Sequence, residues 1–227
     1  MAEFIVGAAS SLTEVLTEAG KAFEKANPGT HVRFSFAASG VLLQQARQGA
    51  PIDVFVSASP KELDTLEKER KLVPGSRKNV AGNSLVLIAP KASGLKDWKE
   101  LASPKIIRVA ISNPEFVPSG RYAKETLTRR GLWNAVAPKA VLGQNVRQTL
   151  AYVAGGDVPA GIVFATDARL EKRVRVVSMA VSGKDHSPIV YSAATLSSST
   201  QSALSQRFLT FLSSPAGRAI FTHFGFR

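Results

Sequence analysis

The chain has 227 residues, of which 44% are apolar and 20% are charged, and it contains no cysteine. This length can bury the core of one large α/β domain or of two smaller lobes. The absence of cysteine excludes disulfides, zinc–thiolate sites, iron–sulfur clusters and a cysteine nucleophile. The longest apolar run, Ser84 to Pro90, is too short to cross a bilayer.

The formal net charge of +12 admits nucleic acid, an anionic membrane surface or a small anion as a partner. The basic clusters lie far apart, at Lys68 to Lys71, Arg129-Arg130 and Lys172 to Arg175, and no zinc-finger spacing or aromatic RNA-binding signature accompanies them. We therefore interpret the charge as scattered over the surface and predict no nucleic-acid partner. A diffuse positive field still speeds the capture of a small dianion.

Short β-branched runs alternate with amphipathic stretches in the first third of the chain. In chain order, the predicted elements are strand Phe4–Val6, a helix from about Leu12 to beyond Phe23, strand His31–Ala37, helix Val41–Gln48, strand Asp53–Val56 and helix Lys61–Arg70. This alternation predicts a parallel sheet covered by helices.

A second α/β cycle follows, so we expect two α/β lobes. Its predicted elements are strand Ser84–Ala89, a short helix at Trp98–Leu101, strand Ile106–Ile111, helix Arg121–Arg130, strand Lys139–Leu142, helix Val146–Val153 and strand Gly161–Phe164. The chain then ends with strands Val174–Val177 and Ile189–Ala194 and helices Thr200–Leu212 and Ala216–Phe221.

Small or polar residues follow four of the predicted strands, at the points where the next helices should begin. The four joints are Ala9-Ser10-Ser11-Leu12, Ala37-Ala38-Ser39-Gly40, Pro118-Ser119-Gly120 and Gln144-Asn145-Val146. Ligands of open α/β sheets bind at the carboxyl ends of the strands, and a helix N-terminus offers unpaired N–H groups and a positive dipole end. The sequence therefore predicts an anion site at these joints.

Ordinary helix capping explains the same residues, because serine and asparagine are the commonest N-caps. Ser11-Leu12-Thr13-Glu14 and Asn145-Val146-Arg147-Gln148 both fit the capping-box template. The two interpretations are compatible, since a cap serine can turn its hydroxyl to a ligand that the first N–H groups also face. The recurrence of the joints in both halves of the chain favours a ligand site.

Enzymatic chemistry finds little support in the sequence. The three histidines have no partners at metal-ligand or triad spacing, and no G-x-S-x-G, P-loop or G-x-G-x-x-G motif occurs. Glu115 precedes the Ser119 joint, but a carboxylate beside an anion site would repel the ligand, so we expect it to cap a helix or to form a salt bridge that points outward. Asp53 and Asp167 are expected to cap helices or pin turns. We predict neither an enzyme nor a resident cofactor.

Six strings of residues, spread in order between Ile5 and the terminal Phe224-Gly225-Phe226, are long enough to be specific. They are Ala8–Thr13, Phe36–Gly40, Gly49–Ala58, Gly82–Pro90, Asn113–Glu125 and Gly161–Phe164. Together they resemble the family of periplasmic molybdate-binding proteins (ModA) of ABC importers, over nearly the whole chain.

The resemblance implies a type II periplasmic-binding-protein fold, with two α/β lobes, a central cleft and two crossover strands. Lobe I would be discontinuous, with residues 1–82 and 190–227, and lobe II would hold residues 83–189, with crossings near Gly82 to Ala89 and Ile189 to Ala194. The implied partner is the set of membrane permease subunits of an importer, which recognise the closed form of a monomer. The first strand is expected to begin near Glu3 with no secretory leader before it, so either the protein is cytoplasmic or its leader has been removed. The resemblance implies the second of these, a periplasmic protein without its leader, with Met1 introduced on expression.

The resemblance also implies a ligand, a tetrahedral oxyanion held between the lobes by neutral donors, with molybdate or tungstate expected. Ser11 and Ser39 would donate through hydroxyl and backbone N–H, and Ser119 and Val146 through backbone N–H. Molybdenum or tungsten would be present only as this bound oxyanion, through the same residues.

Phe164 departs from the family pattern, because the family has a tyrosine that donates its hydroxyl at this position. A hydrogen bond to a charged group contributes about 1.5–3 kcal/mol, so its loss would cost one to two decades in affinity. Ser10, beside Ser11, and Tyr191, on the returning strand, are candidate substitutes for the missing donor.

Two alternative functions stay open. The chain could be a binding protein for sulfate or a phosphorus oxyanion, or a sensor lobe of a DNA-binding protein, which the lack of a helix-turn-helix segment disfavours.

Overall fold

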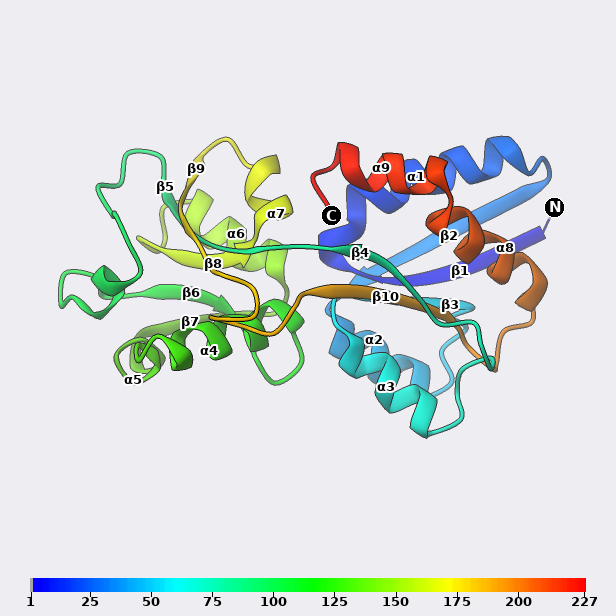
Figure 1. The fold of residues 1–227 in the computed structure, drawn as a ribbon, viewed down its shortest axis with the longest axis horizontal. Helices are drawn as coiled ribbons and strands as arrows, with labels where there is room; N and C mark the ends of the chain where they lie inside the picture. Colours follow the sequence, from blue (N-terminus) through cyan, green and yellow to red (C-terminus); the bar gives the residue numbers. More distant parts are fainter. Residues whose placement is uncertain (1) are drawn as a thin grey trace. The chain divides into compact units, whose positions relative to one another are not determined.

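A computed structural model describes residues 2–227, and these residues divide into two compact units. The first unit contains the chain up to Gly82 together with Val190–Arg227, and the second contains Asn83–Ile189. Each unit has one five-stranded sheet with helices on its faces (Figure 1). No helix in the described part of the chain has the length and apolar character needed to span a membrane.

The first unit is built on a mixed sheet in the order β2-β1-β3-β10-β4. Its elements are β1 (Ala2–Ala9), the 3-10 turn η1 (Ser10–Leu12), α1 (Thr13–Ala26), β2 (Thr30–Ala37), α2 (Ser39–Arg47), β3 (Val54–Ser57), α3 (Pro60–Lys68), β4 (Lys78–Gly82), β10 (Val190–Thr195), α8 (Ser202–Ser213) and α9 (Pro215–His223). Strand β1 pairs in parallel with β2 and β3, whereas β10 runs antiparallel to β3 and β4.

The second unit repeats this plan, with the strand order β7-β6-β8-β5-β9. Its elements are β5 (Leu85–Pro90), η2 (Lys99–Ala102), β6 (Val109–Ser112), α4 (Pro118–Arg129), α5 (Trp133–Val136), η3 (Ala137–Lys139), β7 (Ala140–Gly143), α6 (Val146–Ala154), β8 (Gly161–Phe164), α7 (Ala165–Leu170) and β9 (Val174–Met179). Here β6 is parallel to β7 and β8, and β5 is antiparallel to β8 and β9.

The prediction of a parallel sheet was wrong for one strand in each unit. Three parallel strands form one side of each sheet, as the β-α-β alternation predicted. The fourth strand of each sheet, β10 or β5, directly follows a crossing between the units, and it runs against its neighbours. Strand β4 was also not predicted as an element of its own. The α/β class with two lobe-like units was predicted correctly.

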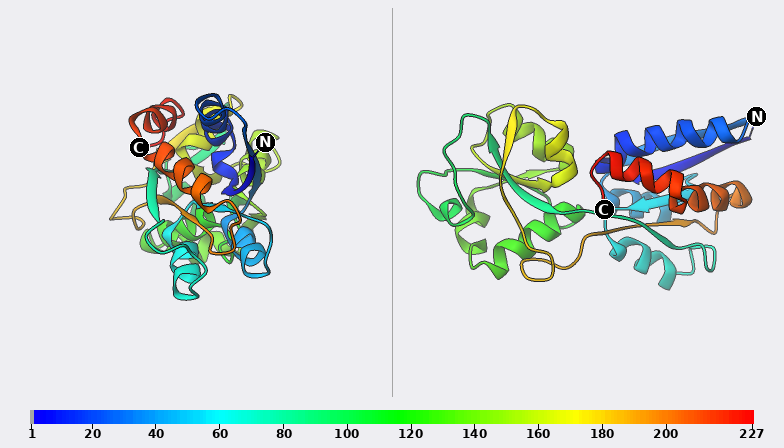
Figure 2. Two further views of the ribbon diagram at one scale, coloured as in Figure 1. Left: turned by 90° about the vertical axis from the view of Figure 1, so that its right-hand side faces the viewer. Right: turned by 45° about the horizontal axis from the view of Figure 1, so that its top comes forward.

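Helices cover both faces of each sheet. In the first unit α1, α8 and α9 lie on one face and α2 and α3 on the other, and in the second unit α4 and α5 lie opposite α6 and α7 (Figures 1 and 2). Phe4 of β1, Phe23 of α1 and Phe208 of α8 are fully buried and pack edge to face, with ring centroids 5.2 to 6.1 Å apart. Such aromatic burial fixes α1 on its sheet, and truncating one ring to alanine costs about 3–5 kcal/mol. The helices that follow the parallel strands are thereby held with their N-termini at the carboxyl ends of those strands.

Candidate functional site

Ser11 and Ser39 lie at one edge of the first sheet. Strands β1 and β2 pair in register as far as Ala9 and Ala37, and each serine stands two residues beyond the end of its strand. Neighbouring strands are about 4.8 Å apart, so the two turns that follow them are also neighbours. Both serines are buried. We call Ser11 and Ser39 the first donor set.

Ser11 does not cap a helix, so the capping box predicted at this residue is wrong. The 3-10 turn η1 separates β1 from α1, which begins at Thr13 and has no side-chain cap. This turn places Ser11 before the helix rather than at its N-cap. The Ser11 hydroxyl oxygen lies 2.9 Å from the Tyr191 hydroxyl of β10 instead. The neighbouring Ser10 is also buried in η1, and its carbonyl accepts a hydrogen bond from the Thr13 hydroxyl.

Ser39 is the first residue of α2, and its hydroxyl already accepts one hydrogen bond. The backbone N–H of Ala58, just past β3, donates to Ser39 Oγ over 3.1 Å. A serine hydroxyl has one proton to donate besides its acceptor lone pairs, so the bond from Ala58 leaves that proton for another acceptor. Ser39 can therefore present both its O–H and its backbone N–H to a ligand.

Ser119 and Val146 occupy the corresponding edge of the second sheet. Strands β6 and β7 pair in parallel up to Ser112 and Gly143, and the helices that follow them, α4 and α6, begin at Pro118 and Val146. Ser119 and Val146 are both buried. We call these two residues the second donor set.

The Ser119 hydroxyl is engaged in a chain of buried hydroxyls inside the second unit. Ser119 Oγ donates to Ser112 Oγ over 2.8 Å, Ser112 Oγ lies 2.8 Å from Thr149 Oγ1, and Thr149 Oγ1 donates to the Asn145 carbonyl. This chain connects the start of α4 to the start of α6. Because the Ser119 proton is directed into it, the group of Ser119 that remains for a ligand is its backbone N–H.

Asn145 caps α6, as the sequence predicted. Its side-chain oxygen accepts from the Gln148 N–H over 2.9 Å, while Gln148 Oε1 accepts from the Gln144 N–H over 2.6 Å. In a capping box the side chain three residues after the N-cap accepts from the backbone N–H of the N-cap residue itself. Here Gln148 accepts from the N–H of Gln144, one residue before the N-cap Asn145. Since the cap satisfies the N–H of Gln148, the N–H of Val146 is left for an outside acceptor.

Backbone donors of both sets are open in the structure. Within residues 2–227 no acceptor is bonded to the backbone N–H of Ser39, Ser119 or Val146. A buried N–H without an acceptor is costly, and a helix start concentrates such groups at its positive dipole end. The arrangement is chemically suited to an anion.

Two glycines allow the second donor set its close packing. A Cβ at Gly120 would collide with the carbonyl oxygen of Ser112, and a Cβ at Gly143 would collide with Thr149 Oγ1. Both glycines adjoin the buried hydroxyl chain. Glycine is required at these positions because the backbone of α4 and the end of β7 approach their neighbours too closely for any side chain.

Phe164 ends β8 directly before α7 and is fully buried. Its ring lies 6.4 Å from that of Tyr122 on α4. The side chain carries no hydrogen-bonding atom, so this strand end contributes no side-chain donor.

The sequence did not predict a buried ion pair behind Val146. Arg147 Nε lies 2.6 Å from Asp167 Oδ1, and the Asp167 side chain is completely buried. The pair joins the first turn of α6 to α7. A cation in the first turn of a helix is disfavoured by the helix dipole, and the Asp167 carboxylate offsets that cost for Arg147.

Other residues singled out in the sequence are structural. Asp53 pins two segments, because its carboxylate accepts from the Ile5 N–H over 2.8 Å and from the Ser199 hydroxyl over 2.6 Å. His186 is buried, with Nδ1 2.7 Å from the Ser187 carbonyl oxygen. No group of three or more metal-ligating side chains occurs in the part of the chain that the structure describes.

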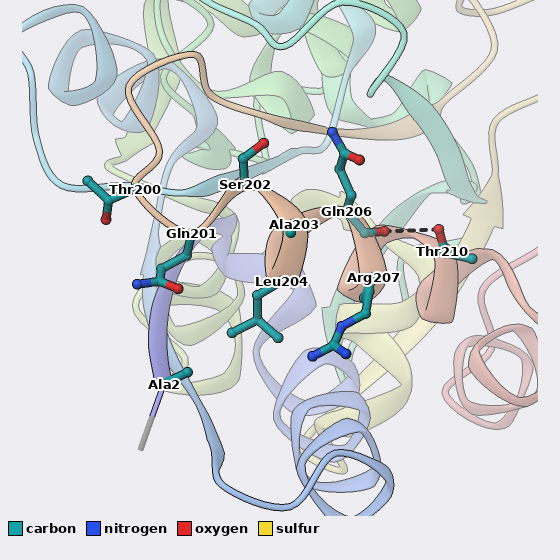
Figure 3. Close-up of a pocket in the computed structure, with 9 residues that line it drawn as sticks. All are labelled: Ala2, Thr200, Gln201, Ser202, Ala203, Leu204, Gln206, Arg207 and Thr210. Atoms are coloured by element: carbon teal, nitrogen blue, oxygen red, sulfur yellow. Dashed lines mark hydrogen bonds between the residues drawn. The ribbon is translucent and has the colours of Figure 1, made fainter.

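A pocket of about 760 Å³ lies elsewhere on the first unit and contains none of the predicted site residues. It is lined by Ala2, by the loop before α8 and by one face of that helix (Figure 3). Gln206 and Thr210, shown there, are joined by a side-chain hydrogen bond, in which the Thr210 hydroxyl donates to the Gln206 carbonyl one turn earlier in α8. This surface offers no arrangement comparable to the two donor sets.

Comparisons with known proteins agree on one family. Residues 4–227 match the model of the family described as bacterial extracellular solute-binding protein. The molybdate-binding protein ModA of Haemophilus influenzae is 36% identical, over 99% of this chain and 90% of its own length. ModA of Escherichia coli is 35% identical, over 97% of this chain and 87% of its own length.

A solved structure supports the same relationship. The periplasmic molybdate-binding protein of Azotobacter vinelandii superposes with a TM-score of 0.88 at 27% identity, covering 99% of this chain and 98% of that protein. The family consists of binding proteins rather than enzymes. The chain therefore belongs to the bacterial extracellular solute-binding proteins, in the family of ModA.

Proposed function

We propose that this chain is the substrate-binding component of an ABC importer and that it binds one tetrahedral oxyanion, molybdate or tungstate. The observation that carries the proposal is the pair of donor sets, which gather neutral N–H and O–H groups at the carboxyl ends of parallel strands in both units. The names of the two bacterial relatives, both molybdate-binding proteins, support the choice of ligand.

The chemistry of the donor sets explains how such a site selects its ligand. Each hydrogen bond to an anion contributes about 1.5–3 kcal/mol, and oriented donors need no rearrangement when the anion enters. In the proposed site Ser11, Ser39, Ser119 and Val146 turn protons toward the ligand, whereas a protonated phosphate needs an acceptor for its own hydroxyl, so the site favours fully deprotonated oxyanions. A fixed ring of donors then separates molybdate and tungstate from the smaller sulfate by size.

The proposal extends to the partners and the setting of the protein. The two units act as the two lobes, with residues 1–82 and 190–227 in one and 83–189 in the other, and Ser11, Ser39, Ser119 and Val146 are the residues proposed to bind the anion. Permease subunits in the membrane recognise the ligand-bound monomer. The protein works in the periplasm, in keeping with the extracellular character of its family.

A second candidate ligand follows from Phe164. Because this buried side chain has no hydroxyl, the chain has one side-chain donor fewer than the family pattern implies. A site with fewer donors suits sulfate or a phosphorus oxyanion if the remaining donors converge more closely.

An anion panel tests both candidates. Thermal denaturation of the purified chain is measured with molybdate, tungstate, sulfate or phosphate, each at equal concentration and constant ionic strength. Molybdate and tungstate should raise the Tm, because a ligand that binds only the folded state stabilises it by about 2.7 kcal/mol at 100 times its Kd. A rise in Tm with sulfate or phosphate alone would show that one of these, and not molybdate or tungstate, is the ligand. An unchanged Tm with all four anions would contradict the proposal.

A further inference from the structure

We propose that Tyr191 is a positioning residue of the oxyanion site, whose hydroxyl donates to Ser11 Oγ and so turns the Ser11 proton toward the ligand. The inference rests on the proposed function and names a residue that determines the strength of that same site. It concerns the first unit only.

The contact between the two hydroxyls is short and fully enclosed. Tyr191 Oη and Ser11 Oγ are 2.9 Å apart, and the residues are 180 positions apart in the sequence. Tyr191 has no exposed surface and Ser11 has 4%. Water therefore does not compete for this bond, and its strength exceeds that of the same bond at the surface.

Packing alone does not account for a tyrosine at this position. The Tyr191 ring packs edge to face on Phe226, with the centroids 5.4 Å apart, and a phenylalanine ring would make the same contact. A buried phenol must also satisfy its hydroxyl, which makes tyrosine the more demanding choice. What tyrosine adds is the hydroxyl, and that hydroxyl lies against a residue of the first donor set.

The pairing of β10 with β4 is irregular beside Tyr191. Tyr191 pairs with Ala81 of β4, but the next residue, Ser192, pairs with Asn79, so Val80 is an extra residue on β4. A β-bulge of this kind changes the direction of side chains and is frequent beside functional sites. The bulge is on β4, opposite Tyr191, and increases the local twist of the strand pair beside the phenol.

The direction of the hydrogen bond follows from the chemistry of the two groups. A phenol is more acidic than an alkyl hydroxyl, which makes Tyr191 the better donor. When Ser11 Oγ accepts this hydrogen bond, the Ser11 hydroxyl proton points away from Tyr191. The Ser11 hydroxyl is then a stronger donor, because hydrogen bonds in a chain polarise one another. Ser11 then donates to the anion in a fixed geometry.

The Ser39 hydroxyl is arranged in the same way, but a different protein group donates to it. Its hydroxyl accepts from the Ala58 N–H, which leaves its proton for a ligand. Each hydroxyl of the first donor set thus has one neighbouring protein donor, a backbone N–H for Ser39 and the Tyr191 phenol for Ser11. Only the second of these can be removed by a side-chain substitution that leaves the serine intact.

The test is a double-mutant cycle on the full chain, with molybdate as the titrant in calorimetry. Tyr191→Phe should raise the Kd about tenfold, which corresponds to about 1.4 kcal/mol, while the Tm without ligand changes little. Ser11→Ala should raise the Kd further. In the Ser11→Ala background, Tyr191→Phe should have no added effect, since Tyr191 acts through Ser11. Tyr152→Phe on α6 is the matched control and should bind as the wild type does.

The outcomes separate this inference from the proposed function. If the wild type binds molybdate or tungstate but Tyr191→Phe binds equally tightly, the inference is wrong and the proposed function stands. Effects of Tyr191→Phe and Ser11→Ala that simply add would also overturn it, because they would show that the phenol acts independently of Ser11. If the wild type binds neither oxyanion, the proposed function fails and the inference fails with it.

Discussion

The two units present similar strand ends but prepare their donors differently. In the first unit the donors include side-chain hydroxyls as well as backbone N–H groups. The Ser39 hydroxyl accepts a hydrogen bond from the Ala58 N–H, and the Ser11 hydroxyl lies against the Tyr191 hydroxyl. In the second unit the donors are backbone N–H groups, and the Ser119 hydroxyl is turned inward to Ser112.

This difference predicts how the two units respond to mutation. A substitution in the first unit removes a ligand-binding group itself, so it should lower affinity. A substitution in the second unit removes only the support of a backbone group, so it should lower stability first. Variants in both units test this division.

Arg147→Met should reduce the free energy of unfolding by about 3–5 kcal/mol. The change leaves the buried Asp167 carboxylate without its cation, and breaking a buried pair from one side has this cost. Urea unfolding of the unliganded protein measures it. Arg169→Met on the exposed end of α7 is the control and should stay within about 0.5 kcal/mol of the wild type. A loss below about 1 kcal/mol for Arg147→Met would show that the ion pair does not support α6.

Ser39→Ala should weaken molybdate binding by about 1.5–3 kcal/mol, or roughly 10- to 150-fold, because one charge-assisted hydrogen bond is lost. Calorimetric titration gives the Kd. Ser198→Ala, at an exposed serine of the same unit, should leave the Kd unchanged. An unchanged Kd for Ser39→Ala would remove Ser39 from the first donor set.

Ser119→Ala should cost about 1 kcal/mol of stability and change the Kd for molybdate less than threefold. The substitution deletes a buried neutral hydrogen bond to Ser112 but keeps the backbone N–H of residue 119. Unfolding and titration of the same preparation separate the two effects. An affinity loss as large as that of Ser39→Ala would mean that the Ser119 hydroxyl, rather than its N–H, binds the ligand.

Asp185→Asn should lower stability by about 0.5–1 kcal/mol at pH 7 without changing the affinity for molybdate. Burial alone would raise the pKa of Asp185, but the Val181 N–H and the Arg130 guanidinium outweigh it and hold the pKa below its usual range. Such a carboxylate stabilises the fold above its unfolded pKa, and the contribution is lost as the pH falls through the lowered folded pKa.

The pH dependence of the Tm checks whether the pKa of Asp185 is lowered in the folded protein. The gap in Tm between the wild type and Asp185→Asn should be complete at pH 7 and should close as the pH falls through the lowered folded pKa of Asp185. A gap that widens toward low pH would contradict the lowered pKa of Asp185.

Local patterns in the sequence predicted the parts of the fold that depend on neighbouring residues. The β-α-β alternation, the positions of the joints and the cap at Asn145 all follow from residues within a few positions of one another. The capping box at Ser11 failed because the same local template fits a helix start and a 3-10 turn placed before one.

Contacts between distant residues were outside the reach of these patterns. The Arg147–Asp167 pair bridges two helices, and the bond between Ser11 and Tyr191 joins the first strand end to the returning strand. Antiparallel β10 and β5 were missed for the same reason, since strand direction depends on how the chain re-enters each sheet. The sequence marked Ser11 and Tyr191 separately, but only the fold shows that they touch.

Calorimetric titration of molybdate into the wild type and into the double variant Ser11→Ala/Ser39→Ala tests most directly whether neutral donors at the strand ends bind the anion. Neutral donors at the strand ends predict one molybdate per chain for the wild type and a loss of binding of at least about 100-fold in the double variant. The scattered surface charge, which is the same in both proteins, should not compensate. Binding of equal strength in both proteins, or no binding of molybdate or tungstate to the wild type, would contradict the proposal that these neutral donors bind the oxyanion.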